Sequence, residues 1–187
     1  MPHRQRCIHH SYTYFRLTEP LPSLPCPYVV GHYGSRNPAW LSNSDFVIEN
    51  KGYIACCLAG EGVMHAGGEQ HRFGVGDTYA CRWNDPGAWH QAAQTHNELR
   101  WVFMVFKGTT ALEILDNMLQ RYGPFYRLDV RSSLVYRLMT VSRQPAHDTA
   151  LNASDGAALV WDLLRAVLHH AEQRTNVRPR VDRKSVV

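Results

Sequence analysis

Short hydrophobic segments separated by glycine-rich turns predominate in the middle of the chain, from Trp40 to Lys107. Aromatic and β-branched residues are frequent in these segments, as in strands that pack on a core. Adjacent glycines at positions 67 and 68 indicate a hairpin, because glycine adopts the positive φ of a tight turn at little cost. Strands this closely spaced predict an antiparallel barrel or sandwich. The predicted segments are residues 46–48, 53–58, the hairpin 64–73, 78–81 and 99–106.

The hydrophobic period changes from two to 3.6 after Gly108, which predicts helices. Thr110 with Glu113 three residues later matches a capping box, and Gly123-Pro124 marks the end of this first helix. A second helix is predicted at residues 132–143 and a third at 154–172. The third carries one stripe of five aliphatic side chains, which are Val160, Leu163, Leu164, Val167 and Leu168.

The two ends of the chain differ in composition from the middle. Residues 1–30 contain five prolines, which fix φ and remove hydrogen-bond donors. They predict an extended arm with a strand near residues 11–17. Residues 175–187 are basic and have no hydrophobic period. The formal net charge is +4, and much of the basic excess lies at the ends, where solvated tails are favoured over a DNA-contacting surface.

Composition narrows the class of protein. With 187 residues, 44% hydrophobic and 19% charged, the chain is long enough for one globular domain with a sizeable core. No hydrophobic run reaches the length of a transmembrane helix, and no secretion signal is visible. The five cysteines are odd in number and include no CxxC pair, so we expect reduced thiols in a cytoplasmic protein.

An ordered series of motifs resembles the cupin barrel and, more closely, the small-molecule-sensing domain of AraC-type transcription regulators. The resemblance covers roughly residues 36 to 175. It predicts a cupin-like jelly-roll barrel, mainly β, followed by about three helices. The matching elements are KGYI at Lys51 to Ile54, the Gly60-Glu61-Gly62 turn, Gly76-Asp77, Pro86-Gly87 with His90, and WVFMVFKG at Trp101 to Gly108.

The resemblance also implies a division of the chain. Residues 1–30 would be the arm, which is either a loosely packed leader or a segment that folds over a ligand pocket. Residues 31–108 would form the effector-binding barrel, and residues 109–174 the helical dimerisation region. Residues 175–187 would be a basic linker to a helix-turn-helix DNA-binding domain that is absent from this sequence, which makes DNA a partner only through that domain.

The motif that holds a metal in cupin enzymes is incomplete here. Its HxH pair would fall on Ala66 and Gly68, so only His90 matches a ligand position. We therefore expect no metal and no other cofactor. A metal-dependent dioxygenase or isomerase is the alternative, using His90 with His65 or His71. A two-residue hairpin turn would place His65 and His71 on opposite faces, whereas a three-residue loop would let both face inward.

The aromatic residues suggest a binding site rather than a catalytic one, since the sequence has no GxSxG motif or phosphate-binding glycine loop. Trp101 and Phe103 alternate with Val102 and Met104, so the two pairs face opposite ways. The resemblance implies that the face with Trp101 lines the pocket for a sugar or another small organic molecule. Packing in the core is the competing interpretation of each ring. The predicted ligand-binding residues are Tyr79, His90, Trp101, Phe103 and His65.

The stripe on the third helix allows two arrangements. It packs on the barrel, or it pairs with the same helix of a second subunit, as the resemblance implies for these five aliphatic residues. The sequence therefore predicts a homodimeric effector-binding domain without enzymatic activity.

Overall fold

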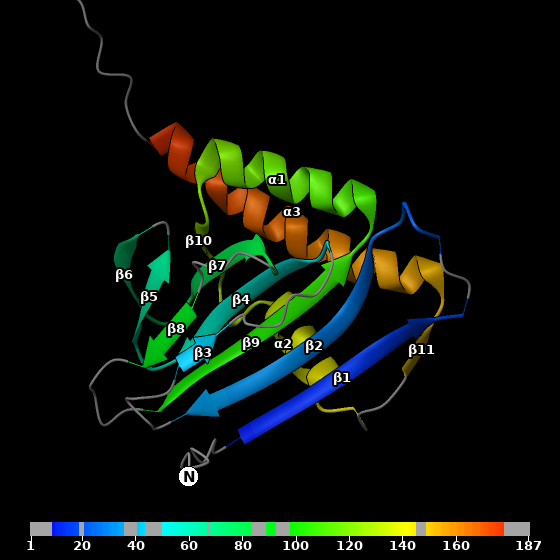
Figure 1. Ribbon diagram of the computed structural model, residues 1–187, viewed down its shortest axis with the longest axis horizontal. Helices are drawn as coiled ribbons and strands as arrows, with labels where there is room; N and C mark the ends of the chain where they lie inside the picture. The colour runs from blue at the N-terminus through cyan, green and yellow to red at the C-terminus, as the bar shows by residue number, and fades with distance from the viewer. Residues whose placement is uncertain are drawn as a thin grey trace, which may run out of the picture.

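The computed structural model describes residues 9–18, 21–35, 41–43, 50–66, 68–83, 89–92, 98–144 and 149–177. Within these ranges two sheets face each other, and helices cover the outer face of the larger one (Figure 1). The larger sheet has the strand order β10 (Phe125–Arg127), β7 (Asp77–Arg82), β4 (Gly52–Ala59), β9 (Leu99–Lys107), β2 (Cys26–Ser35), β1 (His9–Leu17) and β11 (Thr149–Leu151). The smaller sheet has the order β3 (Leu41–Asn43), β8 (Trp89–Ala92), β5 (Gly62–Ala66) and β6 (Glu69–Phe73).

Strand β9 runs through the middle of the larger sheet, and its side chains supply two separate cores. Residues 101 to 106 are all buried, because both faces of the strand are covered. Val102 and Met104 belong to the helix-side core, which lies between the larger sheet and the helices. Trp101 and Phe103 belong to the inner core, which lies between the two sheets. The alternation predicted from the sequence is confirmed.

Three helices follow β9, and their starting points reflect local sequence. α1 (Thr109–Tyr122) begins after Gly108, whose φ of 113° is one that glycine adopts readily. The predicted Thr110 capping box is therefore wrong, since no side chain caps this helix. α2 (Ser133–Ser142) is capped by Ser132, whose hydroxyl accepts a hydrogen bond from the Val135 amide, and α3 (Ala153–Val177) by Asn152, whose side chain accepts one from the Asp155 amide.

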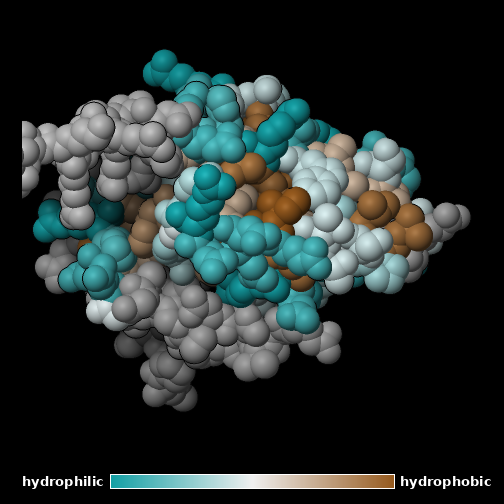
Figure 2. All heavy atoms as spheres, turned by 90° about the horizontal axis from the view of Figure 1, so that it is seen from above, coloured by the Kyte–Doolittle hydropathy of each residue, from teal (hydrophilic) through white to brown (hydrophobic). Residues whose placement is uncertain are grey.

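The aliphatic stripe of α3 packs against its own chain. Val160, Leu163, Leu164 and Val167 are each at most 2% exposed and lie in the helix-side core with side chains of the sheet, α1 and α2. The expectation that these four form a subunit contact is corrected, because they have almost no surface left to bury. Leu168 is half-buried at the edge of the stripe. Seen from above, the helical side shows a small hydrophobic area among hydrophilic side chains (Figure 2).

The N-terminal segment is part of the sheet instead of a separate arm. β1 pairs with β2 in antiparallel register from His9↔Gly34 to Tyr14↔Val29, and β2 pairs in turn with β9. Pro22 and Pro25 lie in the connection between β1 and β2, and Pro27 lies where the β2–β9 register shifts. Tyr12 packs on Phe103 with the ring centroids 5.9 Å apart, so this segment contributes to the inner core.

The predicted fold class is confirmed as two facing sheets followed by three helices, although the described strands of the two sheets do not pair with each other to close a barrel. The predicted strand at 46–48 and the Pro86-Gly87 turn lie outside the described residues. In the described part of the chain no helix is both long enough and apolar enough to cross a membrane.

We predict that Leu164→Ala lowers the free energy of unfolding by about 2–5 kcal/mol, because it leaves a cavity in a packed core. Urea denaturation measures this, and the loss should be the same at low and high protein concentration if the side chain is buried within one chain. Arg165→Ala on the next position is the control, since that side chain is 82% exposed and its ion pair with Asp162 contributes about 0–1 kcal/mol. A loss that grows on dilution would place Leu164 in a subunit interface.

Candidate functional site

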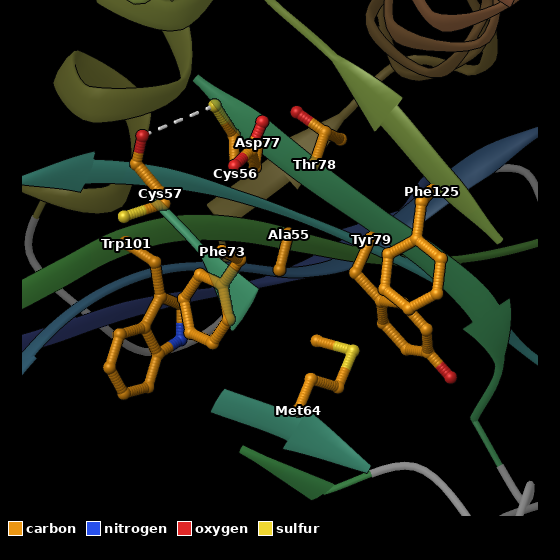
Figure 3. A pocket seen from close by; sticks show the side chains of 10 residues that line it. All are labelled: Ala55, Cys56, Cys57, Met64, Phe73, Asp77, Thr78, Tyr79, Trp101 and Phe125. Carbon is orange, nitrogen blue, oxygen red and sulfur yellow. Dashed lines mark hydrogen bonds between the residues drawn. The ribbon is translucent and has the colours of Figure 1, made fainter. Parts of the chain in front are cut away.

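A small pocket lies between the two sheets, on the inner face of the larger one (Figure 3). Its volume is about 20 Å³, which is roughly the space that one water molecule needs. Met64 of the smaller sheet faces Ala55, Tyr79 and Trp101 of the larger one across this space. The lining residues are Ala55, Cys56, Cys57, Met64, Phe73, Asp77, Thr78, Tyr79, Trp101 and Phe125.

Four of the ten residues that line the pocket are aromatic. Tyr79 and Phe125 come from the neighbouring strands β7 and β10, with ring centroids 5.5 Å apart. His71 stacks on the same Phe125 ring at 4.2 Å, and its ring nitrogen lies 3.7 Å from the Glu69 carboxylate. The rings therefore pack on one another as well as on the cavity, which holds the wall together.

Two of the predicted ligand-binding residues, Tyr79 and Trp101, line this pocket. Phe103 lies in the same inner core but packs on Tyr12 and Tyr53, with centroids 5.9 and 5.7 Å away, and is outside the pocket lining. That these rings bind a ligand stays a prediction, because packing in the core accounts for the same burial.

The hairpin between β5 and β6 shows on which face of the smaller sheet positions 65 and 71 lie. Ala66 pairs with Glu69, which leaves a two-residue turn with Gly68 at φ 80°. His65 is opposite Gln70, and His71 is opposite Met64. Since directly opposed residues share a face, position 65 lies on the outer face and position 71 on the inner face with Met64. The register does not favour His65 as a pocket residue, and its role in ligand binding stays a prediction.

Position 90 belongs to the same inner row as position 71. β5 pairs with β8 so that Met64 is opposite His90 on one side and opposite His71 on the other. Positions 71, 64 and 90 therefore form a cross-strand row on the smaller sheet. Among the described residues no group of three or more His, Cys, Asp or Glu side chains is close enough to hold a metal ion.

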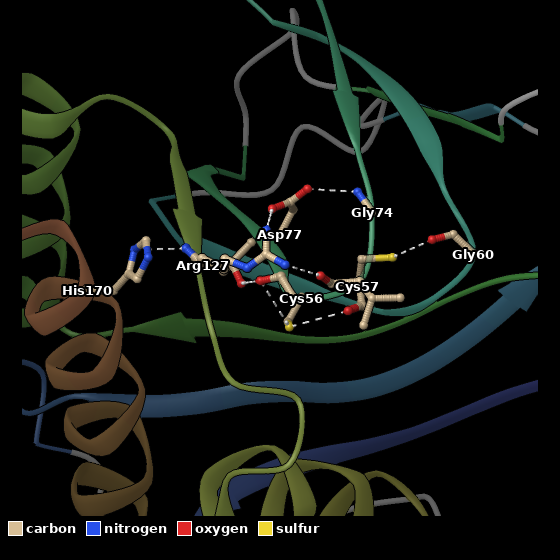
Figure 4. A network of polar contacts seen from close by, with 10 residues as sticks. Cys56, Cys57, Gly60, Gly74, Asp77, Arg127 and His170 are labelled. Atoms are coloured by element: carbon tan, nitrogen blue, oxygen red, sulfur yellow. Dashed lines mark hydrogen bonds and ion pairs between the residues drawn. The ribbon is translucent and has the colours of Figure 1, made fainter. Parts of the chain in front are cut away.

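Polar side chains that line the pocket also belong to a network of hydrogen bonds and ion pairs next to it (Figure 4). One Asp77 carboxylate oxygen accepts a hydrogen bond from the Gly74 amide at 2.8 Å, and the other pairs with Arg127 at 3.2 Å. The Thr78 hydroxyl donates to the Gly76 carbonyl at 3.1 Å. These groups fix the turn between β6 and β7, and the same turn forms one end of the pocket.

Strand β10 connects the pocket with α3. Phe125 lines the pocket, and two residues later the Arg127 amide donates a hydrogen bond to Nδ1 of His170 on α3 at 3.1 Å. The Arg127 guanidinium also reaches the Val75 carbonyl at 3.2 Å. A three-residue strand thus contacts the pocket at one end and the long C-terminal helix at the other.

The sequence analysis did not find Phe73, Phe125 or the Asp77–Arg127 pair as site residues. Gly76-Asp77 was visible as a turn, but nothing local shows which cation neutralises Asp77. Gly123-Pro124 was correctly interpreted as the end of a helix, and the Phe125 that follows becomes a strand residue only by pairing with Tyr79. These contacts join positions far apart in the chain, so no sequence period reveals them.

No family model matches the chain, and no curated protein sequence matches it. A cupin protein from Bacteroides fragilis matches 43% of this chain and 68% of its own at 15% identity and a TM-score of 0.32. The AraC-like transcriptional activator CuxR matches 76% of this chain at 8% identity and a TM-score of 0.43. Ectoine synthase from P. lautus matches 59% of this chain and 80% of its own at 17% identity and a TM-score of 0.31.

The two facing sheets and the three helices agree with the predicted fold class. The chain spans 48% of the length of CuxR, about half of that protein. These neighbours include a regulator and an enzyme at low identity, and they do not decide whether this chain is an enzyme.

The two adjacent thiols of β4 are protonated at neutral pH. Cys56 lies in the helix-side core and Cys57 in the inner core, so they point to opposite faces and do not bridge each other. Burial raises the pKa of Cys56 to about 11 and that of Cys57 to about 12. Since the thiolate is the reactive form, neither thiol is poised as a nucleophile.

We predict that stability falls as the pH rises above 9. The unfolded chain ionises these thiols from their ordinary pKa of 9.0, whereas the folded chain keeps the Cys56 proton to about pH 11. The unfolded state therefore binds fewer protons in this window, and each thiol lowers the free energy of unfolding by up to about 1.4 kcal/mol per pH unit. Urea denaturation between pH 8.5 and 10 measures the slope.

Cys56→Ala should make this slope shallower. The control is Val102→Ala, which truncates the buried residue opposite Cys56 in the β4–β9 register without removing a titrating group. It should lower stability equally at every pH. An unchanged slope in Cys56→Ala would contradict the raised pKa of this thiol.

Proposed function

We propose that the chain is the small-molecule-sensing and dimerisation domain of an AraC-type transcription regulator, with the effector bound between its two sheets. The observation that carries this proposal is the link from the pocket through β10 to α3. Phe125 lines the pocket, and the Arg127 amide of the same strand is hydrogen bonded to His170 of α3. In a regulator, a change at the pocket must reach the element that leads to the DNA-reading domain.

The effector would act by stabilising one arrangement of this link over another. A ligand shifts a conformational equilibrium only by the difference in its affinity for the two states. Because the pocket is small, an occupant has to displace some of its lining. Displacement of Phe125 would move β10 and would change the hydrogen bond between the Arg127 amide and His170 of α3. A helix-turn-helix domain following α3 would then be presented differently to DNA.

A homodimer is part of this proposal, with a contact other than the one first expected. Four of the five stripe residues are in the core, so a contact through α3 would use its half-buried edge. That edge includes Leu168 and Trp161, which are half-buried and pack against the helix-side core. Seen from above, the helical side shows hydrophobic side chains among hydrophilic ones (Figure 2).

We predict that filling the pocket by mutation changes α3. Ala55 lies on the inner face of β4, opposite Phe103 and Tyr79 in the register, and lines the pocket. Ala55→Leu overpacks it at a cost of about 1–3 kcal/mol, and the lining has to shift. Hydrogen exchange should become faster at the Arg127 amide and in the turn of α3 around His170.

The double variant Ala55→Leu with His170→Ala separates transmission from general loosening. Without the imidazole acceptor, pocket filling should still disturb β10 but no longer α3. His169→Ala is the matched control, since that neighbouring side chain is exposed and contacts Gln173 at 2.8 Å on its own helix. If Ala55→Leu disturbs β10 but leaves hydrogen exchange in α3 unchanged, the proposed link is ruled out.

The second candidate is a metal-dependent cupin enzyme, which the inner row of positions 71 and 90 favours. Of the two partners considered for His90, the register favours His71, because positions 65 and 90 are on opposite faces of the smaller sheet. For the sensing domain we expect substoichiometric iron, manganese, nickel and zinc in purified protein by plasma mass spectrometry. One metal per chain, lost in both His71→Ala and His90→Ala but retained in His65→Ala, would establish the enzyme instead.

A further inference from the structure

We propose that the pocket recognises a flat, uncharged aromatic compound rather than a sugar or an organic acid. This inference rests on the proposed sensing function and concerns the class of its effector. The lining supplies four aromatic rings, the Met64 thioether, the Cys57 thiol and the Ala55 methyl group (Figure 3). Such surfaces bind an aromatic ring through stacking and through sulfur–aromatic contacts, and both faces of a planar ligand can make these contacts.

The polar side chains of the lining are committed to the protein itself. Both carboxylate oxygens of Asp77 have partners, in the Gly74 amide and the Arg127 guanidinium. The Thr78 hydroxyl donates to the Gly76 carbonyl. The Tyr79 hydroxyl points away from Met64 and Trp101 (Figure 3). A sugar would bury several hydroxyl groups against these surfaces and lose the hydrogen bonds that they make in water, which disfavours its binding.

Charge disfavours an organic acid in the same way. The carboxylate of Asp77 is the charged group of the described lining, and it already has Arg127 as its counter-ion at 3.2 Å. An anionic ligand would meet this carboxylate, and the cation beside it is held in the network. Burial of an ion without a dedicated partner is unfavourable. An uncharged ring avoids that cost.

The pocket has to widen before a ring can enter, and its position shows which side chains would move. The space is about 20 Å³, so entry requires the side chains on the smaller sheet to move. Met64 and Phe73 are on the β5–β6 hairpin, and of these two strands only β5 pairs with a third strand, β8. Methionine has several accessible rotamers and fills irregular gaps, so Met64 is suited to make room for a ring.

Titration calorimetry with six probes tests the class of ligand. Phenol against cyclohexanol tests flatness, and benzyl alcohol against benzoate tests charge, while L-arabinose represents the sugars. We expect phenol and benzyl alcohol to bind at least about tenfold more tightly than cyclohexanol, benzoate and L-arabinose, and indole to bind more tightly than phenol because it offers more stacking area. Ala55→Leu should abolish this binding. Ala158→Leu, the same change at an exposed position of α3, should leave it intact.

The outcomes separate this inference from the sensing function. Binding of L-arabinose or benzoate in preference to the aromatic probes, blocked by Ala55→Leu, would overturn the aromatic class and leave the sensing proposal standing. Binding that Ala55→Leu does not reduce would place the aromatic compounds elsewhere and overturn the inference. If no probe binds while hydrogen exchange in α3 still responds to Ala55→Leu, the proposed ligand class is overturned as well. The exchange experiment needs no ligand, so it tests the sensing function independently.

Discussion

Strict alternation along β9 is the constraint on which the rest of this structure depends. Trp101 and Phe103 are buried toward the smaller sheet, and Met104 and Phe106 toward the helices. A slip by one residue would therefore exchange the two cores. Glycines on the neighbouring strands make room for one phenylalanine ring on each face. A Cβ at Gly31 would be 2.4 Å from the Phe103 ring on the inner side, and one at Gly52 would be 2.4 Å from the Phe106 ring on the helix side.

The turn at Gly76 is the second constraint, because three segments meet at its backbone. Its amide donates to the Cys57 carbonyl of β4 at 2.9 Å, and its carbonyl accepts from the Leu128 amide after β10 at 2.8 Å. Its φ of 88° suits glycine, and a Cβ would be 2.9 Å from the Leu128 carbonyl oxygen. The close approach brings Asp77 to Arg127, so the pocket rim and the support of β10 depend on one residue without a side chain.

Local patterns made much of this fold predictable, and contacts between distant segments set the limit. The alternation at residues 99–106, the presence of a hairpin and the three helices each follow from a few neighbouring residues, whereas the length of the hairpin turn does not. β10 and β11 have three residues each and exist through pairing with β7 and β1, so no local period marks them. The stripe on α3 predicts that Leu164 is buried. It does not show whether this side chain packs on the sheet of the same chain or against a second subunit. The strand predicted near residues 11–17 is part of β1, whereas β2 was not predicted, because Pro22 and Pro25 lie just before it and Pro27 lies at its register shift.

The geometry also explains how the two faces of one sheet can influence each other. The pocket and the helices are separated by β9, which is paired on both sides and cannot move without breaking two ladders. β10 is at the edge of the sheet and pairs only with β7. Its Phe125 belongs to the inner side, and the next residue, Tyr126, is buried in the helix-side core. A shift of this short edge strand therefore reaches both cores while the central ladders stay intact, which makes the edge the least costly route from the pocket to α3.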